Sequence, residues 1–408
     1  MNVLLLGNGF DLHNKLPTAY IDFLYTIQFL KNDYDSSMNT VGKIFGNEVL
    51  QNKDKNIKDS YEIYKKIYNS ISLDENVVNS LVQRANDNLW FQYLSNFLQK
   101  NMSWIDFEKE IARIVNAFNY FFEHLGEPVR DTEQEKIIYL ISQFSFFIKG
   151  GSGDYNAGYF WDVEDFKDKY AIETPIGTGL YEANKESIIS DLSEMLSELS
   201  DMLRDYLLYF VDALSKEMNL LGHYIVNPSY PQINVVCTFN YTNTYEFLYN
   251  PNVSACHIHG DSSKKIVLGI NPDEKDDLNN LDTSFLQFKK YFQRVFYKTD
   301  ISYLKLMEDL KLTYNSNGKD QVSLYIAGHS LDKTDEDIIQ ELFGLSNRIT
   351  IFYHDELAIG KYIKNLVSIY GKKKFDKLRV EKNLEFIQHE EIVRYNSDSN
   401  TKMGETIK

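Results

Sequence analysis

Residues 1–24 read MNVLLLGNGFDLHNKLPTAYIDFL and begin with a short apolar run that ends at glycine. Residues 3–6 have the length of one buried strand, and the Gly-Asn-Gly of residues 7–9 follows directly. Between residues 18 and 24 the apolar side chains fall on one helical face. A strand, a glycine turn and a helix in this order are typical of the start of a nucleotide-binding α/β fold.

The glycine turn predicts a phosphate site. We expect Gly7 to take a positive φ in the tight turn and Gly9 to let the chain pass close to a ligand. The backbone N–H groups that follow would then face a phosphate. Leu12 occupies the position of the third glycine in the dinucleotide fingerprint. The alternative is an ordinary strand-to-helix turn in which Asp11 caps the helix.

Composition restricts the class of protein. The 408 residues include 59 acidic and 43 basic side chains, and the formal charge of −16 argues against a nucleic-acid-binding surface. The two cysteines, Cys237 and Cys256, indicate a reducing cytoplasm and give no disulfide framework. We expect no signal peptide and no membrane span, because the amino terminus lacks a basic region and no run of 18 apolar residues exists.

After the first strand, the chain consists of a long helical region followed by a region of alternating strands and helices. Residues 26–230 show helical periodicity, whereas residues 231–396 alternate between strands and helices. We predict an α/β, Rossmann-like, doubly wound parallel sheet formed by residues 1–25 and 231–396, with a large α-helical insertion at 26–230. The first strand should therefore pair with strands more than 200 residues later, and residues 397–408 should form a flexible tail.

Individual elements follow from the same periodicities. Helices are predicted at residues 57–72, 75–99, from 103 onward, 133–148, 180–221 (ending near Gly222), 283–293, 300–313, 334–343 and 355–369. Strands are predicted at residues 233–237, 255–259, 266–270, 322–327, 348–353 and 384–388.

Polar residues at the ends of these strands are the candidate site, since ligands of parallel sheets bind at the carboxyl ends of strands. Asn240 follows one strand as an amide that is either a ligand-positioning group or a turn cap. His257 and His259 alternate along the next strand and should share a face. The sequence offers this pair no third ligand, so we predict no metal site. His259, beside Gly260, is the candidate general base, and a hydrogen-bonded structural histidine is the alternative.

Another loop and one helix add candidates. Gly328-His329-Ser330 directly after a strand suits a second approach to phosphate or ribose, and an ordinary loop capped by Asp332 or Thr334 is the alternative. Trp104 and Glu108 lie four residues apart on one helical face. We expect them to form a lid over the site, with a core tryptophan and a surface ion pair as the alternative.

These stretches resemble the AbiH family of bacterial abortive-infection proteins. The resemblance rests on GNGFD followed by a spacer and LPTxYxDF, which residues 7–23 match at Leu16, Pro17, Thr18, Tyr20, Asp22 and Phe23. The run WIDFE at residues 104–108 is similar to an interior family motif, and Lys15 stands where a glycine is common. The resemblance spans the chain and implies a role in defence against phage.

The α/β part also resembles, more distantly, the sirtuin-like domains of antiphage NADases. GNGF, TFNYT, HIHGD and GHSLD occur in the same order as the motifs of that family. The resemblance implies that Asn240 positions the ribose and attacking water and that His259 works at the nicotinamide ribose. The nucleotide-binding residues that it implies are Gly7, Asn8, Gly9, Phe10, Asp11, Thr238, Gly260, Gly328, His329 and Ser330.

Asp11 departs from the serine or alanine usual in the sirtuin-like turn. A carboxylate there would repel a pyrophosphate unless it turned away or bound ribose hydroxyls. Lysine deacetylation is not expected, because deacetylating sirtuins carry a four-cysteine zinc module and this chain has two cysteines.

The resemblances together imply a cytoplasmic enzyme that hydrolyses NAD or a related nucleotide when phage infection triggers it. The alternatives are a non-catalytic nucleotide sensor that controls a partner and an enzyme that transfers ADP-ribose to a macromolecule. We expect the helical insertion to shape substrate access, to sense a phage-derived trigger or partner protein, or to build a homo-oligomer.

Overall fold

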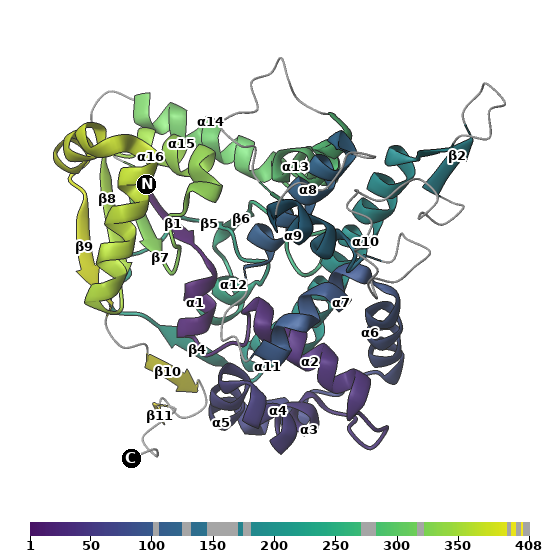
Figure 1. Ribbon diagram of the computed structural model, residues 1–408. Helices are drawn as coiled ribbons and strands as arrows, with labels where there is room; N and C mark the ends of the chain where they lie inside the picture. Colours follow the sequence, from purple (N-terminus) through teal and green to yellow (C-terminus); the bar gives the residue numbers. More distant parts are fainter. Residues whose placement is uncertain are drawn as a thin grey trace. The chain divides into compact units, whose positions relative to one another are not determined.

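Six parallel strands form the central sheet, with β1 between β5 and β7 (Figure 1). The computed structural model describes residues 1–100, 106–124, 132–144, 170–173, 181–270, 283–315, 322–389, 393–396 and 401–402. Along the sheet the strands are β6 (Ser254–His257), β5 (Val235–Thr238), β1 (Asn2–Leu6), β7 (Ser323–Ala327), β8 (Arg348–Tyr353) and β9 (Glu385–Gln388). Val3 lies opposite Val235, so the predicted pairing of the first strand with strands far along the chain is confirmed.

Both faces of this sheet are buried, which explains why β1 is apolar at every position from Val3 to Leu6. Val3 and Leu5 pack on the side of α14 (Ile301–Asn315), α15 (Glu336–Gly344) and α16 (Glu356–Glu381). Leu4 and Leu6 pack on the opposite side, with side chains of α1 (Asn8–His13) and α12 (Thr244–Leu248). Each of these strand side chains contributes roughly 1.5–3 kcal/mol by its burial.

The chain divides into two compact units. Unit 1 comprises Met1–Asn79, Leu203–Val267 and Arg294–Lys408, and unit 2 comprises Ser80–Met202 and Leu268–Gln293. The central sheet belongs to unit 1. The predicted insertion at residues 26–230 covers parts of both units, and its folding as a separate inserted domain stays a prediction.

Short helices complete the amino-terminal part of unit 1. After α1 come α2 (Tyr20–Asn32), α3 (Val41–Phe45), α4 (Glu48–Lys53) and α5 (Lys55–Ser70). A second sheet, which the sequence did not predict, joins β4 (His223–Val226), β10 (Val393–Asn396) and β11 (Thr401–Lys402) in antiparallel order. Two residues of the predicted flexible tail therefore pair with a strand.

The remaining helices carry most of unit 2. They are α6 (Glu75–Asp87), α7 (Leu89–Ser95), α8 (Phe107–Glu123), α9 (Thr132–Ile141), α10 (Lys185–Tyr206) and α13 (Lys290–Tyr297), with a hairpin of β2 (Ala171–Glu173) and β3 (Tyr181–Ala183). Trp90 of α7 is fully buried, and its indole Nε1–H donates to the Leu192 carbonyl of α10 over 2.9 Å.

Three of the predicted elements are wrong in detail. Residues 266–270 form no strand apart from a bridge between Ile270 and Lys289, because the side chain of Gln293 takes both backbone hydrogen bonds of Leu268. The long helix begins at Lys185 and includes a π-helical segment, Leu207–Asp212, before α11 (Ala213–Leu220). The helix predicted from residue 103 begins at Phe107, where Asp106 accepts a hydrogen bond from the Lys109 N–H as its cap.

The strands predicted at 233–237, 255–259, 322–327, 348–353 and 384–388 are confirmed within a few residues. The single helix predicted at 75–99 is divided into α6, α7 and a 3-10 helix, and the one at 283–293 into a 3-10 helix and α13. The predicted end of the long helix is confirmed, since Gly222 follows α11 with a φ of 72°. The predicted helix at 355–369 continues to Glu381 as α16, with a kink at Gly371. Residues 103–105, 145–148 and 180 of three predicted helices lie outside the described residues.

Candidate functional site

The loops after β5 and β6 meet at the carboxyl edge of the sheet. Thr238 lies opposite His257 in the parallel register, so the residues that follow the two strands are neighbours. The His257 Nδ1 lies 3.2 Å from the carbonyl oxygen of Asn240. The ring of His259 meets Phe239 edge-on with 5.3 Å between centroids, and Phe239 lies 4.4 Å from the ring of His329. Phe239, which the sequence analysis did not select, therefore joins the loops after β5, β6 and β7.

Asn240 is buried at this edge with an unpaired amide oxygen. Its side chain is 7 % exposed, and its backbone N–H donates to Thr238 Oγ1 over 3.0 Å. The amide Oδ1 is buried and has no hydrogen-bond partner among the described residues. Leaving such an acceptor unpaired costs about 1–3 kcal/mol, which makes the group a candidate for contact with a ligand.

The two histidines of the HIHGD motif have different surroundings. β6 ends at His257, so the alternation predicted to place His257 and His259 on one face does not extend to His259. His257 Nε2 lies 2.7 Å from Glu246 Oε1. Burial lowers the pKa of His257, but the hydrogen bond and charge of Glu246 outweigh it and raise that pKa overall. His257 is therefore held by Glu246, and the predicted base, His259, packs against Phe239.

The glycine turn is packed against another loop. Gly7 has a φ of −132°, so the predicted positive φ is wrong. A Cβ at Gly7 would lie 2.6 Å from the His329 Cα, and one at Gly9 would lie 2.7 Å from the Gly328 carbonyl oxygen. The Gly9 N–H donates to that oxygen over 2.8 Å. These two glycines therefore let the turn pack closely against the loop after β7.

Gly328 completes the same contact. Its φ is +66°, and a Cβ there would lie 2.0 Å from the Phe10 backbone nitrogen. His329 is buried, its Nδ1 accepts from the Leu331 N–H over 2.9 Å, and its Nε2 lies 3.4 Å from Asp335 Oδ2. Ser330 is exposed. The cap predicted as the alternative for this loop is present, because Asp332 accepts from the Thr334 N–H.

Asp11 does not cap α1, whose N-cap is Gly7. Its carboxyl is 1 % exposed, and Oδ2 accepts from the Thr242 hydroxyl over 2.6 Å. Burial raises the pKa of Asp11 to about 7. Hydrogen bonds from Thr242 and Thr244 lower this pKa, and the charges of Asp212 and Glu246 raise it further. The carboxyl is thus turned into the protein and partly protonated near neutral pH.

A second buried acid lies in the same neighbourhood and was missed by the sequence analysis. Asp212 accepts from the Ser262 hydroxyl over 2.5 Å and from the backbone and side-chain nitrogens of Asn243. Burial raises the pKa of Asp212 to about 6, although these hydrogen bonds lower it. Asp212 ends the π-helical segment, a distortion frequent at functional sites that helical periodicity does not reveal.

The remaining predicted residues are placed as follows. Asn8 Oδ1 accepts from the Thr18 hydroxyl over 2.6 Å, and Phe10 is buried with its ring 5.2 Å from that of Tyr249. Gly260 has a φ of 79° and turns tightly against the Lys265 carbonyl. In unit 2, Glu108 Oε2 lies 2.8 Å from Nζ of the buried Lys290. Trp104 lies outside the described residues, and the lid stays a prediction.

The LPTxYxDF residues are structural in this fold. The Pro17 carbonyl accepts from the Tyr206 hydroxyl over 2.8 Å. Asp22 is fully buried, with Oδ2 accepting from the Ala19 N–H over 2.8 Å and Oδ1 from Asn56 Nδ2 over 3.0 Å. The motif therefore fixes the start of α2 and joins it to the helices that follow.

Comparison with known families agrees with this motif. Residues 3–355 match the family model described as Bacteriophage abortive infection AbiH. The chain belongs to the AbiH family. The comparison with curated proteins found no match, nor did the comparison with solved structures. Membership assigns the chain to a family of phage abortive-infection proteins, and the described helices include none long and apolar enough to span a membrane.

Proposed function

We propose that this AbiH-family chain hydrolyses the nicotinamide glycosidic bond of NAD, or of a related nucleotide, during phage infection. The observation that carries the proposal is the buried, unpaired Oδ1 of Asn240 at the carboxyl edge of a parallel sheet. His259 follows the neighbouring strand, and the two loops are in contact through Phe239 and His257. An amide acceptor and an imidazole at one sheet edge suit the binding of a ribose.

The strand order supports a dinucleotide ligand. With the six strands renumbered in chain order, the sequence β6-β5-β1-β7-β8-β9 becomes 3-2-1-4-5-6, the order of classic dinucleotide-binding folds. In such sheets the ligand binds where the order reverses, which here is between β1 and β7. The Gly7 and Gly328 loops follow those two strands, which supports their assignment to the dinucleotide.

The reaction needs positioning more than strong acid catalysis. The bond between the ribose carbon and the nicotinamide ring nitrogen breaks through an oxocarbenium-like state, and its electron pair leaves with the now neutral nicotinamide. Water attacks the ribose carbon and gives its proton to a base, so the products are nicotinamide, ADP-ribose and a proton. We assign the ribose and water positioning to Asn240 and the base to His259.

The burial of Asp11 reduces one objection to an anionic ligand. A carboxylate exposed in the glycine turn would repel pyrophosphate, but Asp11 bonds Thr242 and has a pKa raised to about 7 by burial. The raised pKa means that Asp11 opposes an anion less at neutral pH than an ordinary carboxylate does.

A second candidate function is a nucleotide sensor that binds without turnover and controls a partner. The packing of Gly7 and Gly9 against Gly328 and His329 favours it, because the closed loops leave no room for a side chain at either glycine. Under this alternative, ligand binding requires the two loops to separate.

Isotope-labelled NAD separates these functions. The purified chain is incubated with the label, alone and with extract of phage-infected cells that supplies a trigger. Hydrolysis predicts free nicotinamide and ADP-ribose in equal amounts, and Asn240→Ala should abolish both. Saturable binding without release of nicotinamide in either condition would favour the sensor, and label on a macromolecule would favour ADP-ribosyl transfer. The absence of both binding and turnover would refute the proposal.

A further inference from the structure

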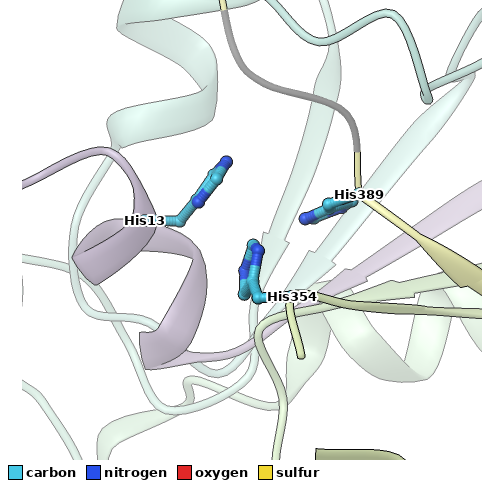
Figure 2. A group of neighbouring side chains, drawn as sticks. All are labelled: His13, His354 and His389. Atoms are coloured by element: carbon cyan, nitrogen blue, oxygen red, sulfur yellow. The ribbon is translucent and has the colours of Figure 1, made fainter. Parts of the chain in front are cut away.

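Three histidines from distant parts of the chain converge at the carboxyl edge of the sheet. Figure 2 shows His13 at the end of α1, His354 just after β8 and His389 just after β9, with their rings directed toward a common space. One nitrogen from each ring can be chosen so that all three lie within 4.8 Å of one another. All three residues belong to unit 1.

The fold itself brings these rings together. Tyr353 and Gln388 are paired in the parallel register of β8 and β9, so the histidine after each strand stands at the same level of the sheet. The His389 N–H donates to the Tyr353 carbonyl over 2.8 Å and fixes this arrangement. His13 stacks on His354 with 4.2 Å between ring centroids, and His389 lies 5.4 Å from His13 and 4.8 Å from His354.

Three ring nitrogens of the cluster are buried without a hydrogen-bond partner among the described residues. They are Nε2 of His13 and both ring nitrogens of His389. A neutral imidazole with an unused nitrogen is the form that binds transition metals.

We propose that His13, His354 and His389 form a binding site for a divalent transition-metal ion of the zinc type. Imidazole suits Zn²⁺, Cu²⁺, Fe²⁺ and Ni²⁺, and three protein ligands leave one coordination position open. Nitrogens bound tetrahedrally at about 2.0–2.1 Å lie roughly 3.4 Å apart, so the widest pair must close by on the order of 1.4 Å. Rotation of the exposed His354 side chain supplies this movement and a route of entry.

The surrounding charges are mixed. Lys15 and Arg394 lie close enough to His13 to lower its pKa, and they oppose a cation. Asp355 lies close enough to His354 to raise its pKa, and its negative charge favours a cation. The Lys15→Gln variant should therefore bind metal several times more tightly than the wild type.

Aromatic stacking is the competing explanation of the cluster, and phenylalanine distinguishes the two. The His354→Phe variant keeps a ring against His13 but removes a ligand. We expect the wild type to bind about one Co²⁺ with a tetrahedral visible spectrum that Zn²⁺ abolishes by displacement. Zn²⁺ should also raise its Tm. His354→Phe and His389→Ala should each weaken Co²⁺ binding at least about 100-fold. Loss of a group that only supports a ligand weakens metal binding by up to about 100-fold, and loss of a ligand itself should cost at least as much.

The control is His124→Gln, which removes a histidine whose Nδ1 contacts the Tyr120 carbonyl and should leave Co²⁺ binding unchanged. Because His354 is exposed, its variant should keep the wild-type Tm in the presence of EDTA and so report on binding alone. Equal Co²⁺ affinity in wild type and His354→Phe, or no binding by the folded wild type, would overturn the proposal. No nucleotide enters these measurements, so their outcome is independent of NAD hydrolysis.

Discussion

Lys15 adopts a φ of 61° directly after α1, in the left-handed region that disfavours residues with a Cβ. Glycine adopts this conformation without strain. The Lys15→Gly variant should raise the free energy of unfolding by about 1 kcal/mol, because glycine relieves the left-handed strain. Urea unfolding monitored by circular dichroism measures the change.

The control for this prediction is Lys15→Ala, which removes the positive charge but keeps the Cβ. It should give no comparable gain. If alanine stabilises the protein as much as glycine does, the effect comes from charge and not from backbone conformation.

Asp11 should make stability depend on pH. Burial raises its pKa from 3.8 to about 7 in the folded state, so between these values the folded chain binds a proton that the unfolded chain has lost. The contribution of Asp11 is thus fully present below about pH 4 and is lost as the pH rises through about 7. Three pKa units correspond to at most about 4 kcal/mol.

The Asp11→Asn variant isolates this contribution, because it removes the ionisation and keeps the shape. Relative to wild type, the variant should become more stable as the pH rises from 5 to 8. The contributions of groups that do not interact with Asp11 cancel in the difference, whereas Asp212 and Glu246 lie close enough to act on its pKa and also lose a neighbouring charge. Denaturant unfolding at the two pH values is the measurement. A constant difference across this range would show that Asp11 ionises normally in the folded protein.

The loops after β1 and β7 act as one packed element, and this changes the expected effect of mutation at the glycine turn. A Cβ at Gly9 would lie 2.7 Å from a backbone oxygen that cannot move freely. The Gly9→Ala variant should therefore lose about 1–3 kcal/mol of stability, the range for overpacking. The substitution affects folding as well as any ligand.

Gly360 offers a matched control, since it lies in the exposed part of α16 and a Cβ there has no atom within 4 Å. The Gly360→Ala variant should gain roughly 0.5–1 kcal/mol from helix propensity. Thermal unfolding of the two variants should move Tm in opposite directions. Equal Tm values for Gly9→Ala and wild type would mean that the two loops separate easily.

The sequence predicted elements well where burial gives a simple periodicity. The runs at 322–327 and 348–353 are buried on both faces and became β7 and β8. The run at 266–270 is equally apolar, but a side chain, Gln293, satisfies its backbone in place of a neighbouring strand. The antiparallel sheet of β4 and β10 was missed because β4 is short and has a single buried residue, Ile225.

At the level of the whole chain, the sequence predicted the sheet edge but not the partners of the residues there. The expected neighbourhood of the Asn240 and His259 loops follows from adjacent parallel strands and is observed. The Glu246 partner of His257, the Asp212 network and the histidine cluster each depend on tertiary contacts between loops. No local pattern of residue types encodes these contacts.

The central claim is that the Asn240 amide serves the defence reaction and not the fold. Protection of bacteria against phage, measured as efficiency of plating, tests it in cells that produce Asn240→Ala or the control Asn252→Ala, which alters an exposed loop amide. With soluble protein levels and Tm matched to wild type, we predict that Asn240→Ala loses protection and Asn252→Ala keeps it. Full protection by a well-folded Asn240→Ala variant would contradict the assignment of the site.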